Sequence, residues 1–207
     1  MEQRFRRRLQ RPLPTRQPRR RFLILCEGKV TEPGYFTELR VELRSRLVDI
    51  EVLPECGVPK TLVEHAVERK KEAERQARRA RDPFLKYDEV WCVFDVDSHP
   101  NLPEAKQQAR DNGLNVAISN PNFELWILLH FQDQFAEHDR REITRLCKLH
   151  LPRYEKEVPY MTLRPLYADA VRRAEHLQTL QAQRGTPGGN PSTGVYRLTE
   201  SIQMALR

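Results

Sequence analysis

Residues 21–33, RFLILCEGKVTEP, decide how the rest of the chain can fold. An apolar run from Phe22 to Cys26 stops abruptly at Glu27 and Gly28, and a helical pattern begins a few residues later. A short apolar run bounded by a glycine turn is typical of a buried strand. A carboxylate at the end of such a strand indicates a functional residue rather than a packing residue. The alternative is that Glu27 caps the turn.

Apolar strands and amphipathic helices alternate through the first two thirds of the chain. Strands are expected at 22–26, 48–53, 88–94 and 114–118, and helices at 32–47, 61–81, 102–112 and 120–131. Thr61 opens a capping box at the start of the second helix, and Asn120 and Pro121 are expected to cap and open the fourth. Strands that alternate with helices predict an α/β fold with a mainly parallel sheet covered on both faces.

The last third of the chain shows only helical patterns, at about 141–150, 164–183 and 195–206. We therefore expect a flexible basic tail at 1–20, an α/β catalytic core at 21–135 and a helical part at 136–207. The apolar faces of these helices either pack on the core of the same chain or on a second copy, so a homo-oligomer is one option.

The positive charge of the chain is concentrated at its N-terminus. Residues 1–21 hold nine arginines and one acid, which gives +8 (9 − 1), whereas the remainder has 27 bases and 28 acids, which gives −1. A segment rich in arginine and proline with few apolar residues is typical of disorder, and arginine suits bidentate contacts with phosphate. We expect Arg19, Arg20 and Arg21 to contact nucleic acid; a solvated tail without a partner is the alternative.

Composition argues against several classes of protein. No apolar run approaches the roughly 20 residues that cross a bilayer, and no apolar signal-peptide core follows the N-terminal arginines. The four cysteines are scattered without a C-x-x-C pair, which favours neither a zinc site nor a disulfide framework. The sequence therefore predicts a cytoplasmic protein with no membrane partner.

Acidic residues fall where the predicted strands end. Glu27 follows the first strand, Asp95 and Asp97 follow the third, and Glu124 lies one turn into the helix after the fourth, while Glu32 opens the first helix. The carboxyl ends of parallel strands meet at one edge of the sheet, so these carboxylates are expected to converge. The alternatives are a turn role for the two aspartates and a favourable helix-dipole position for the two glutamates.

Crowded carboxylates repel each other and normally surround a cation. A ligand set of oxygens without His or Cys favours Mg²⁺ or Mn²⁺, which activates water and neutralises charge at a phosphodiester. We take Glu27, Asp95, Asp97 and Glu124 as candidate metal ligands. His99 is a candidate general base and Lys29 a candidate phosphate contact, although a loop histidine and a solvated lysine are the commoner situations.

Longer motifs around these acids resemble known families. Residues 24–28 (ILCEG) together with 95–97 (DVD) resemble the Toprim domain of topoisomerases, primases and OLD-type nucleases. Three further stretches resemble the RloB-like family, also called AbiLii-like: 26–36 (CEGKVTEPGYF), 120–131 (NPNFELWILLHF) and 190–196 (NPSTGVY). The resemblance extends from about residue 20 to the C-terminus.

The resemblance implies a bacterial Toprim-type, metal-dependent endonuclease that acts in phage defence by abortive infection. It implies that Glu27 is a general acid/base or a metal ligand and that Asp95 and Asp97 hold the ion, with Glu32 and His99 as further catalytic candidates. RNA (including transfer RNA) and DNA both remain candidate substrates. The sequence has no G-x-x-x-x-G-K loop, so the AAA-type or ABC-type ATPase that often accompanies the family is expected to be a separate chain. The alternative is a non-catalytic module that binds nucleic acid or that ATPase; a primase or nucleotidyl transferase is less favoured.

Overall fold

The computed structural model describes residues 19–43, 48–54, 57–96, 101–155 and 157–206. Its strands are β1 (Arg20–Cys26), β2 (Val48–Pro54), β3 (Glu89–Asp95), β4 (Asn115–Asn120) and β5 (Ser192–Thr193). Its α-helices are α1 (Thr31–Leu43), α2 (Pro59–Ala80), α3 (Leu102–Asp111), α4 (Glu124–Leu128), α5 (Arg140–His150), α6 (Tyr160–Leu163), α7 (Tyr167–Gln183) and α8 (Val195–Met204). Two short 3-10 helices, η1 (Pro83–Leu85) and η2 (Arg164–Leu166), lie between them.

The strands form one sheet in the order β2-β1-β3-β4-β5. The first four strands run parallel to each other, and β5 pairs antiparallel with the end of β4. The predicted mainly parallel α/β sheet is therefore confirmed. β1 lies between β2 and β3, which explains why Phe22 to Cys26 are fully buried and why this stretch is apolar on both of its faces.

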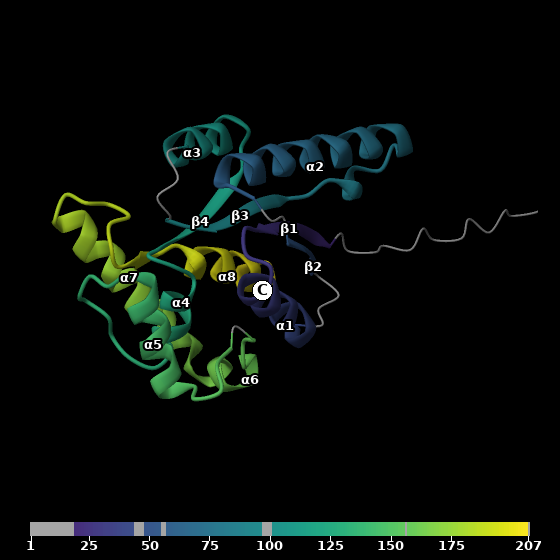
Figure 1. Cartoon of the computed structure of the whole chain (residues 1–207). Coiled ribbons are helices and arrows are strands. Elements are labelled where there is room, and N and C mark those ends of the chain that lie inside the picture. The colour runs from purple at the N-terminus through teal and green to yellow at the C-terminus, as the bar shows by residue number, and fades with distance from the viewer. Residues whose placement is uncertain (1–18, 44–47, 55–56, 97–100, 156, 207) are drawn as a thin grey trace, which may run out of the picture.

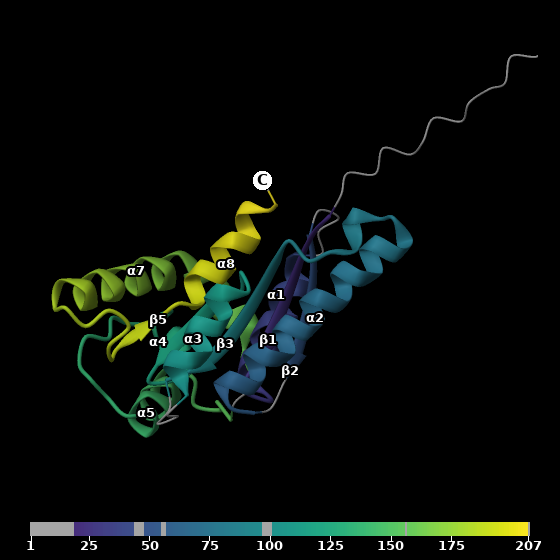
Figure 2. The same cartoon turned by 90° about the horizontal axis from the view of Figure 1, so that it is seen from above.

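Helices cover both faces of the sheet, with α2 and α3 on one face and α1 and the C-terminal helices on the other (Figure 1). Alternate residues of β1 serve the two faces. Leu23 and Leu25 pack against α2 and α3, whereas Phe22, Ile24 and Cys26 pack against the other layer. The view from above shows α7 and α8 beside the β5 edge, far from α2 (Figure 2).

The helical C-terminal part packs on the sheet of its own chain. Its buried residues share one apolar core with Tyr35 and Phe36 of α1 and with Trp126 of α4. Arg173 of α7 also donates to the carbonyl oxygens of Leu129 and His130, at 2.7 and 2.9 Å. Within the described residues, the buried apolar faces of this part are therefore covered without a second copy.

Several predicted boundaries were wrong. β4 continues to Asn120, where it pairs with Ser192, and α4 begins only at Glu124, with Phe123 at its cap position. The helix predicted to start with a capping box at Thr61 begins at Pro59, because proline suits the first helical turn. β5 was not predicted, since two residues show no periodicity. No helix in the described ranges is both long and apolar enough to span a bilayer.

Candidate active site

A hollow of about 550 Å³ lies at the carboxyl edge of the sheet, in front of β1, β3 and β4. Its walls come from the turn after β1, the end of β3, the segment after β4 and the start of α5. Three carboxylates line it, those of Glu32, Asp95 and Glu124. Three cations line it as well: Lys29, Arg140 and Arg141.

Glu27 joins the ends of β1 and β3. Its backbone N–H donates to the carbonyl of Val93 at 3.0 Å, and its Oε2 accepts from the backbone N–H of Asp95 at 3.2 Å. Glu27 is half-buried. The residue therefore lies at the predicted edge and binds the backbone of Asp95, but its side chain is not among those that line the hollow.

Asp95 is the most constrained acid of the site. It is 7% exposed, and its Oδ2 accepts from Arg140 at 2.6 Å. Burial, followed by repulsion from Glu32, raises the pKa of Asp95 well above its ordinary value, and Glu124 adds to the rise while Arg140 opposes it. The hollow therefore disfavours negative charge unless a cation is present.

Glu32 reaches the hollow because residue 28 is glycine. A Cβ placed on Gly28 would lie 2.0 Å from Oε2 and 2.6 Å from Cδ of Glu32. These distances are far shorter than van der Waals contact, so any side chain here would displace the carboxylate. Glu32 is 7% exposed and lies in the first turn of α1, where the helix dipole favours an acid. Both of its predicted roles, dipole partner and site carboxylate, are compatible with this position.

Glu124 is held from the side of the C-terminal helices. Its Oε1 accepts from the hydroxyl of Tyr154 at 3.3 Å, and its carbonyl accepts from the thiol of Cys147 at 3.2 Å. Burial and the neighbouring Glu124 both raise the pKa of Tyr154, so the hydroxyl keeps its proton and remains a donor. Next to it, the buried Oδ1 of Asn122 has no hydrogen-bond partner within the described part of the chain.

The donor set fits a hard divalent cation in its chemistry. The hollow is lined by three carboxylates and by Asn122, and oxygen ligands are those that Mg²⁺ and Mn²⁺ prefer. Among the described residues, no group of three His, Cys, Asp or Glu side chains lies close enough together to hold an ion. Asp97 and His99, both candidates from the sequence, lie outside the described residues.

Arg20 and Arg21 lie at the opposite end of β1 from this hollow. Seven strand residues at about 3.3 Å each separate the two ends by roughly 20 Å. Arg21 is engaged inside the fold: it pairs with Asp49 at 3.3 Å, donates to the carbonyl of Leu85 and lies 4.6 Å above the ring of Tyr87. Arg20 pairs with Glu89 at 2.9 Å. Their prediction as nucleic-acid contacts, with that for the exposed Arg19, stays a prediction.

Sequence reasoning missed three contributors to the site: Asn122, Arg140 and Arg141. Asn122 lies in the 120–131 motif, so its place in a motif could have indicated it. The sequence around Arg140 carries no signal of its contact with Asp95, which lies 45 residues earlier. Arg140 and Arg141 also show that cations of the folded body, and not only those of the N-terminal segment, lie at the candidate site. The body of the chain sums to −1, and the hollow brings three cations together with three carboxylates.

The sequence of the whole α/β body and its helical part matches one family model, described as RloB: RloB-like protein, over residues 22–202. The chain belongs to the RloB-like family. The matched range includes every residue of the hollow, from Gly28 to Thr144. No curated protein and no solved structure matches the chain.

Proposed function

We propose that this RloB-like protein is a metal-dependent endonuclease of the Toprim type, which cleaves phosphodiester bonds of RNA or DNA. One observation carries the proposal: Glu32, Asp95 and Glu124 come from three separate segments and line one hollow whose rim carries Lys29, Arg140 and Arg141. A buried acid whose pKa is raised by burial and by neighbouring carboxylates, as that of Asp95 is, is typical of functional sites. Flanking cations suit a substrate with a negatively charged backbone.

Asp95, Glu124 and Asn122 are the residues we expect to hold Mg²⁺ or Mn²⁺, together with Glu27 and Asp97 if their carboxylates turn toward the hollow. A bound ion of this kind supplies charge neutralisation at the phosphodiester and an activated water. Because Arg140 contacts the Oδ2 of Asp95, it is expected to move away from this oxygen when an ion binds.

The remaining residues would act on the nucleic acid directly. Lys29, Arg140 and Arg141 are placed to bind non-bridging phosphate oxygens, with an arginine guanidinium able to make two parallel hydrogen bonds. Proton exchange with the attacking water or the leaving oxygen is assigned to Glu32, because Asp95 and Glu124 are assigned to the ion and Glu27 accepts from the backbone N–H of Asp95.

The test is cleavage of transfer RNA, single-stranded RNA and duplex DNA in Mg²⁺ or Mn²⁺ by the wild type and by Asp95→Asn and Glu124→Gln. Both variants are expected to lose at least about a hundredfold in rate while keeping a wild-type circular dichroism spectrum. Asp111→Asn is the matched control and should cleave normally, because Asp111 is an exposed acid on α3 that accepts from Gln107 and lies outside the hollow. Unchanged cleavage by both site variants would contradict the proposal.

A module that binds nucleic acid or a partner without catalysis is the second candidate. Two observations favour it: no three acids in the described ranges lie close enough together to hold an ion, and the carboxylate of Asp95 is already bonded to the guanidinium of Arg140. We further propose a role in bacterial anti-phage defence together with a separate ATPase. Toxicity on co-expression with that ATPase distinguishes the candidates: a nuclease loses toxicity on Asp95→Asn, whereas a binding module keeps it.

A further inference from the structure

A second hollow, of about 130 Å³, lies between α3, β4, β5, α7 and α8 and shares no residue with the acidic one. Its floor is made by Val116 and Ile118 of β4. These two side chains point to the face of the sheet that α2 and α3 cover. Asp95 lies on the opposite face, because strand alternation places it with Trp91 and Val93.

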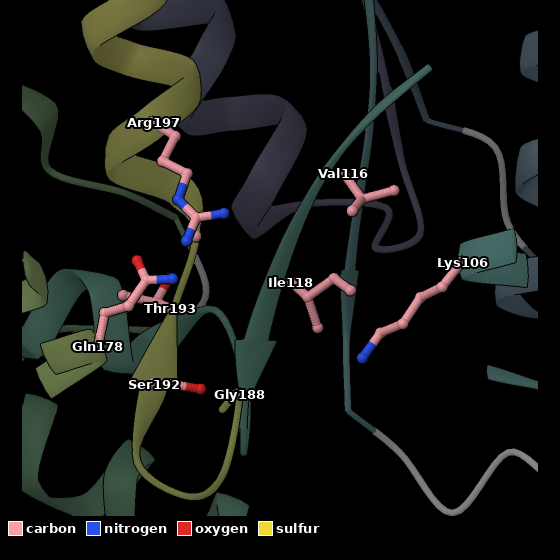
Figure 3. A pocket seen from close by; sticks show the side chains of 9 residues that line it. Lys106, Val116, Ile118, Gln178, Gly188, Ser192, Thr193 and Arg197 are labelled. Carbon is pink, nitrogen blue, oxygen red and sulfur yellow. The ribbon is translucent and has the colours of Figure 1, made fainter. Parts of the chain in front are cut away.

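The side chains of Lys106, Arg197, Gln178 and Ser192, which line this hollow, can all donate hydrogen bonds. Figure 3 shows Lys106 approaching from α3 on one side and Arg197, Gln178 and Ser192 from the other. No Asp or Glu lines the hollow. Within the described parts of the chain, neither Lys106 nor Arg197 forms an ion pair.

Tyr196 fixes two of these donors. Its hydroxyl donates to Oε1 of Gln178 and accepts from Nε of Arg197 at 3.3 Å. The amide oxygen of Gln178 accepts from Tyr196, and the amide nitrogen Nε2 points toward the hollow (Figure 3). Within the described residues, the terminal nitrogens of the Arg197 guanidinium form no hydrogen bond, since its bond to Tyr196 is made by Nε.

The wall that carries Ser192 is attached firmly to the sheet. The backbone N–H of Gly194 donates to the carbonyl of Ile118 at 2.8 Å, and the hydroxyls of Thr193 and Ser119 lie 2.9 Å apart. A Cβ on Gly194 would approach the nitrogen of Ile118 to 3.3 Å, so glycine allows this close contact. These contacts fix the position of residues 192–194 at the wall of this hollow. Residues 190–196 do not line the acidic hollow.

Two cations that face one small hollow repel each other, and no acid of its walls compensates for them. α8 begins at Val195, beside the hollow, and its N-terminal end adds positive potential. The space exceeds the roughly 30 Å³ of one water molecule, and a group of a few non-hydrogen atoms can enter it. An anion with several acceptor oxygens matches these donors in charge and in hydrogen bonding.

We propose that this hollow binds a phosphate group, with Lys106 and Arg197 as its cationic contacts and Ser192 and Gln178 as neutral donors. The inference does not depend on the catalytic proposal, because the two hollows are separate. The phosphate belongs either to a nucleic-acid backbone or to a small phosphate compound, and the same four donors serve both.

Binding is measured on the full-length chain in EDTA, by calorimetry with inorganic phosphate and pyrophosphate and by anisotropy with a labelled RNA oligonucleotide. Lys106→Gln and Arg197→Gln are each expected to weaken binding about tenfold, as loss of one charge-assisted contact does. The double variant should bind at least about a hundredfold more weakly. Arg110→Gln and Lys71→Gln are the controls, since both are exposed cations on α3 and α2 that lie outside the hollow.

The probes separate the two sources of phosphate. Loss of phosphate or pyrophosphate binding in the double variant, with oligonucleotide binding unchanged, identifies a small-compound site. Loss of oligonucleotide binding with no measurable binding of the free anions identifies a backbone contact. Equal binding of every probe by the wild type, the double variant and the two controls would overturn the inference, as would a wild type that binds no probe.

Discussion

Replacing Arg140 with glutamine removes the guanidinium that lies 2.6 Å from Oδ2 of Asp95. The Asp95 side chain is 10% exposed and that of Arg140 is 45% exposed. Removal of one partner from a fully buried pair costs about 3–5 kcal/mol, whereas an exposed pair contributes about 0–1 kcal/mol. Because this pair is intermediate, we expect Arg140→Gln to lose about 2 kcal/mol at pH 7.

The loss should depend on pH in a defined direction. The folded state raises the pKa of Asp95, and Arg140 restrains that rise; without Arg140 the pKa rises further. A carboxyl with a raised pKa in the folded state destabilises the protein while it is charged; this destabilisation decreases as the pH falls below the folded-state pKa and is gone below the ordinary pKa of the unfolded chain. The difference in stability between wild type and Arg140→Gln should therefore shrink as the pH is lowered from 7.

Thermal unfolding followed by circular dichroism measures both effects. For a chain of 207 residues, 2 kcal/mol corresponds to a fall in Tm of about 4–8 °C. The double variant Arg140→Gln/Asp95→Asn should recover most of the loss, because the buried charge is gone. Arg141→Gln, which lines the same hollow, is the control and should change Tm little. A Tm of Arg140→Gln equal to that of wild type at pH 7, or no recovery in the double variant, would refute this account of the site.

Three further predictions test other parts of the structure. Gly28→Ala should push the Glu32 carboxylate out of the hollow, because the added Cβ would lie 2.0 Å from Oε2. We expect at least about a tenfold loss of cleavage with a small change in Tm, and cleavage equal to that of wild type would contradict this prediction. Arg21→Met should lower stability by about 1–3 kcal/mol, since it removes a pair with Asp49 and a contact with Tyr87; an unchanged Tm would contradict this expectation. Burial lowers the pKa of His130 to about 4, so its ring should stay neutral from pH 8 to 5 in an NMR titration, and protonation near pH 6.5 would show that the ring is not buried.

Much of the fold follows from local pattern. The apolar run of β1 predicts a buried strand, and the structure places β1 between β2 and β3 with Phe22 to Cys26 buried. The start of α4 could not be predicted, because Asn120 and Pro121 resemble a helix cap while strand pairing of Asn120 with Ser192 keeps the backbone extended. Tertiary pairing outweighed a local signal there.

The candidate site likewise contains residues that the sequence could indicate and one that it could not. Glu32, Asp95 and Glu124 were found from their positions at strand and helix ends, because topology alone brings such positions together. Arg140 could not be found in this way. Its contact with Asp95 depends on how α5 docks against the sheet, and a helix sequence specifies which face is buried rather than which distant residue its first turn will meet.

The pairing of β5 with β4 has a consequence for synthesis of the chain. Ser119 and Asn120 pair with Thr193 and Ser192, which the ribosome adds more than seventy residues later. Until then the exposed end of β4 is an unpaired strand edge of the kind that templates aggregation. A nascent chain paused before residue 192 would therefore depend on chaperones more than the finished one, and the short β5 segment would act as the step that ends this exposure.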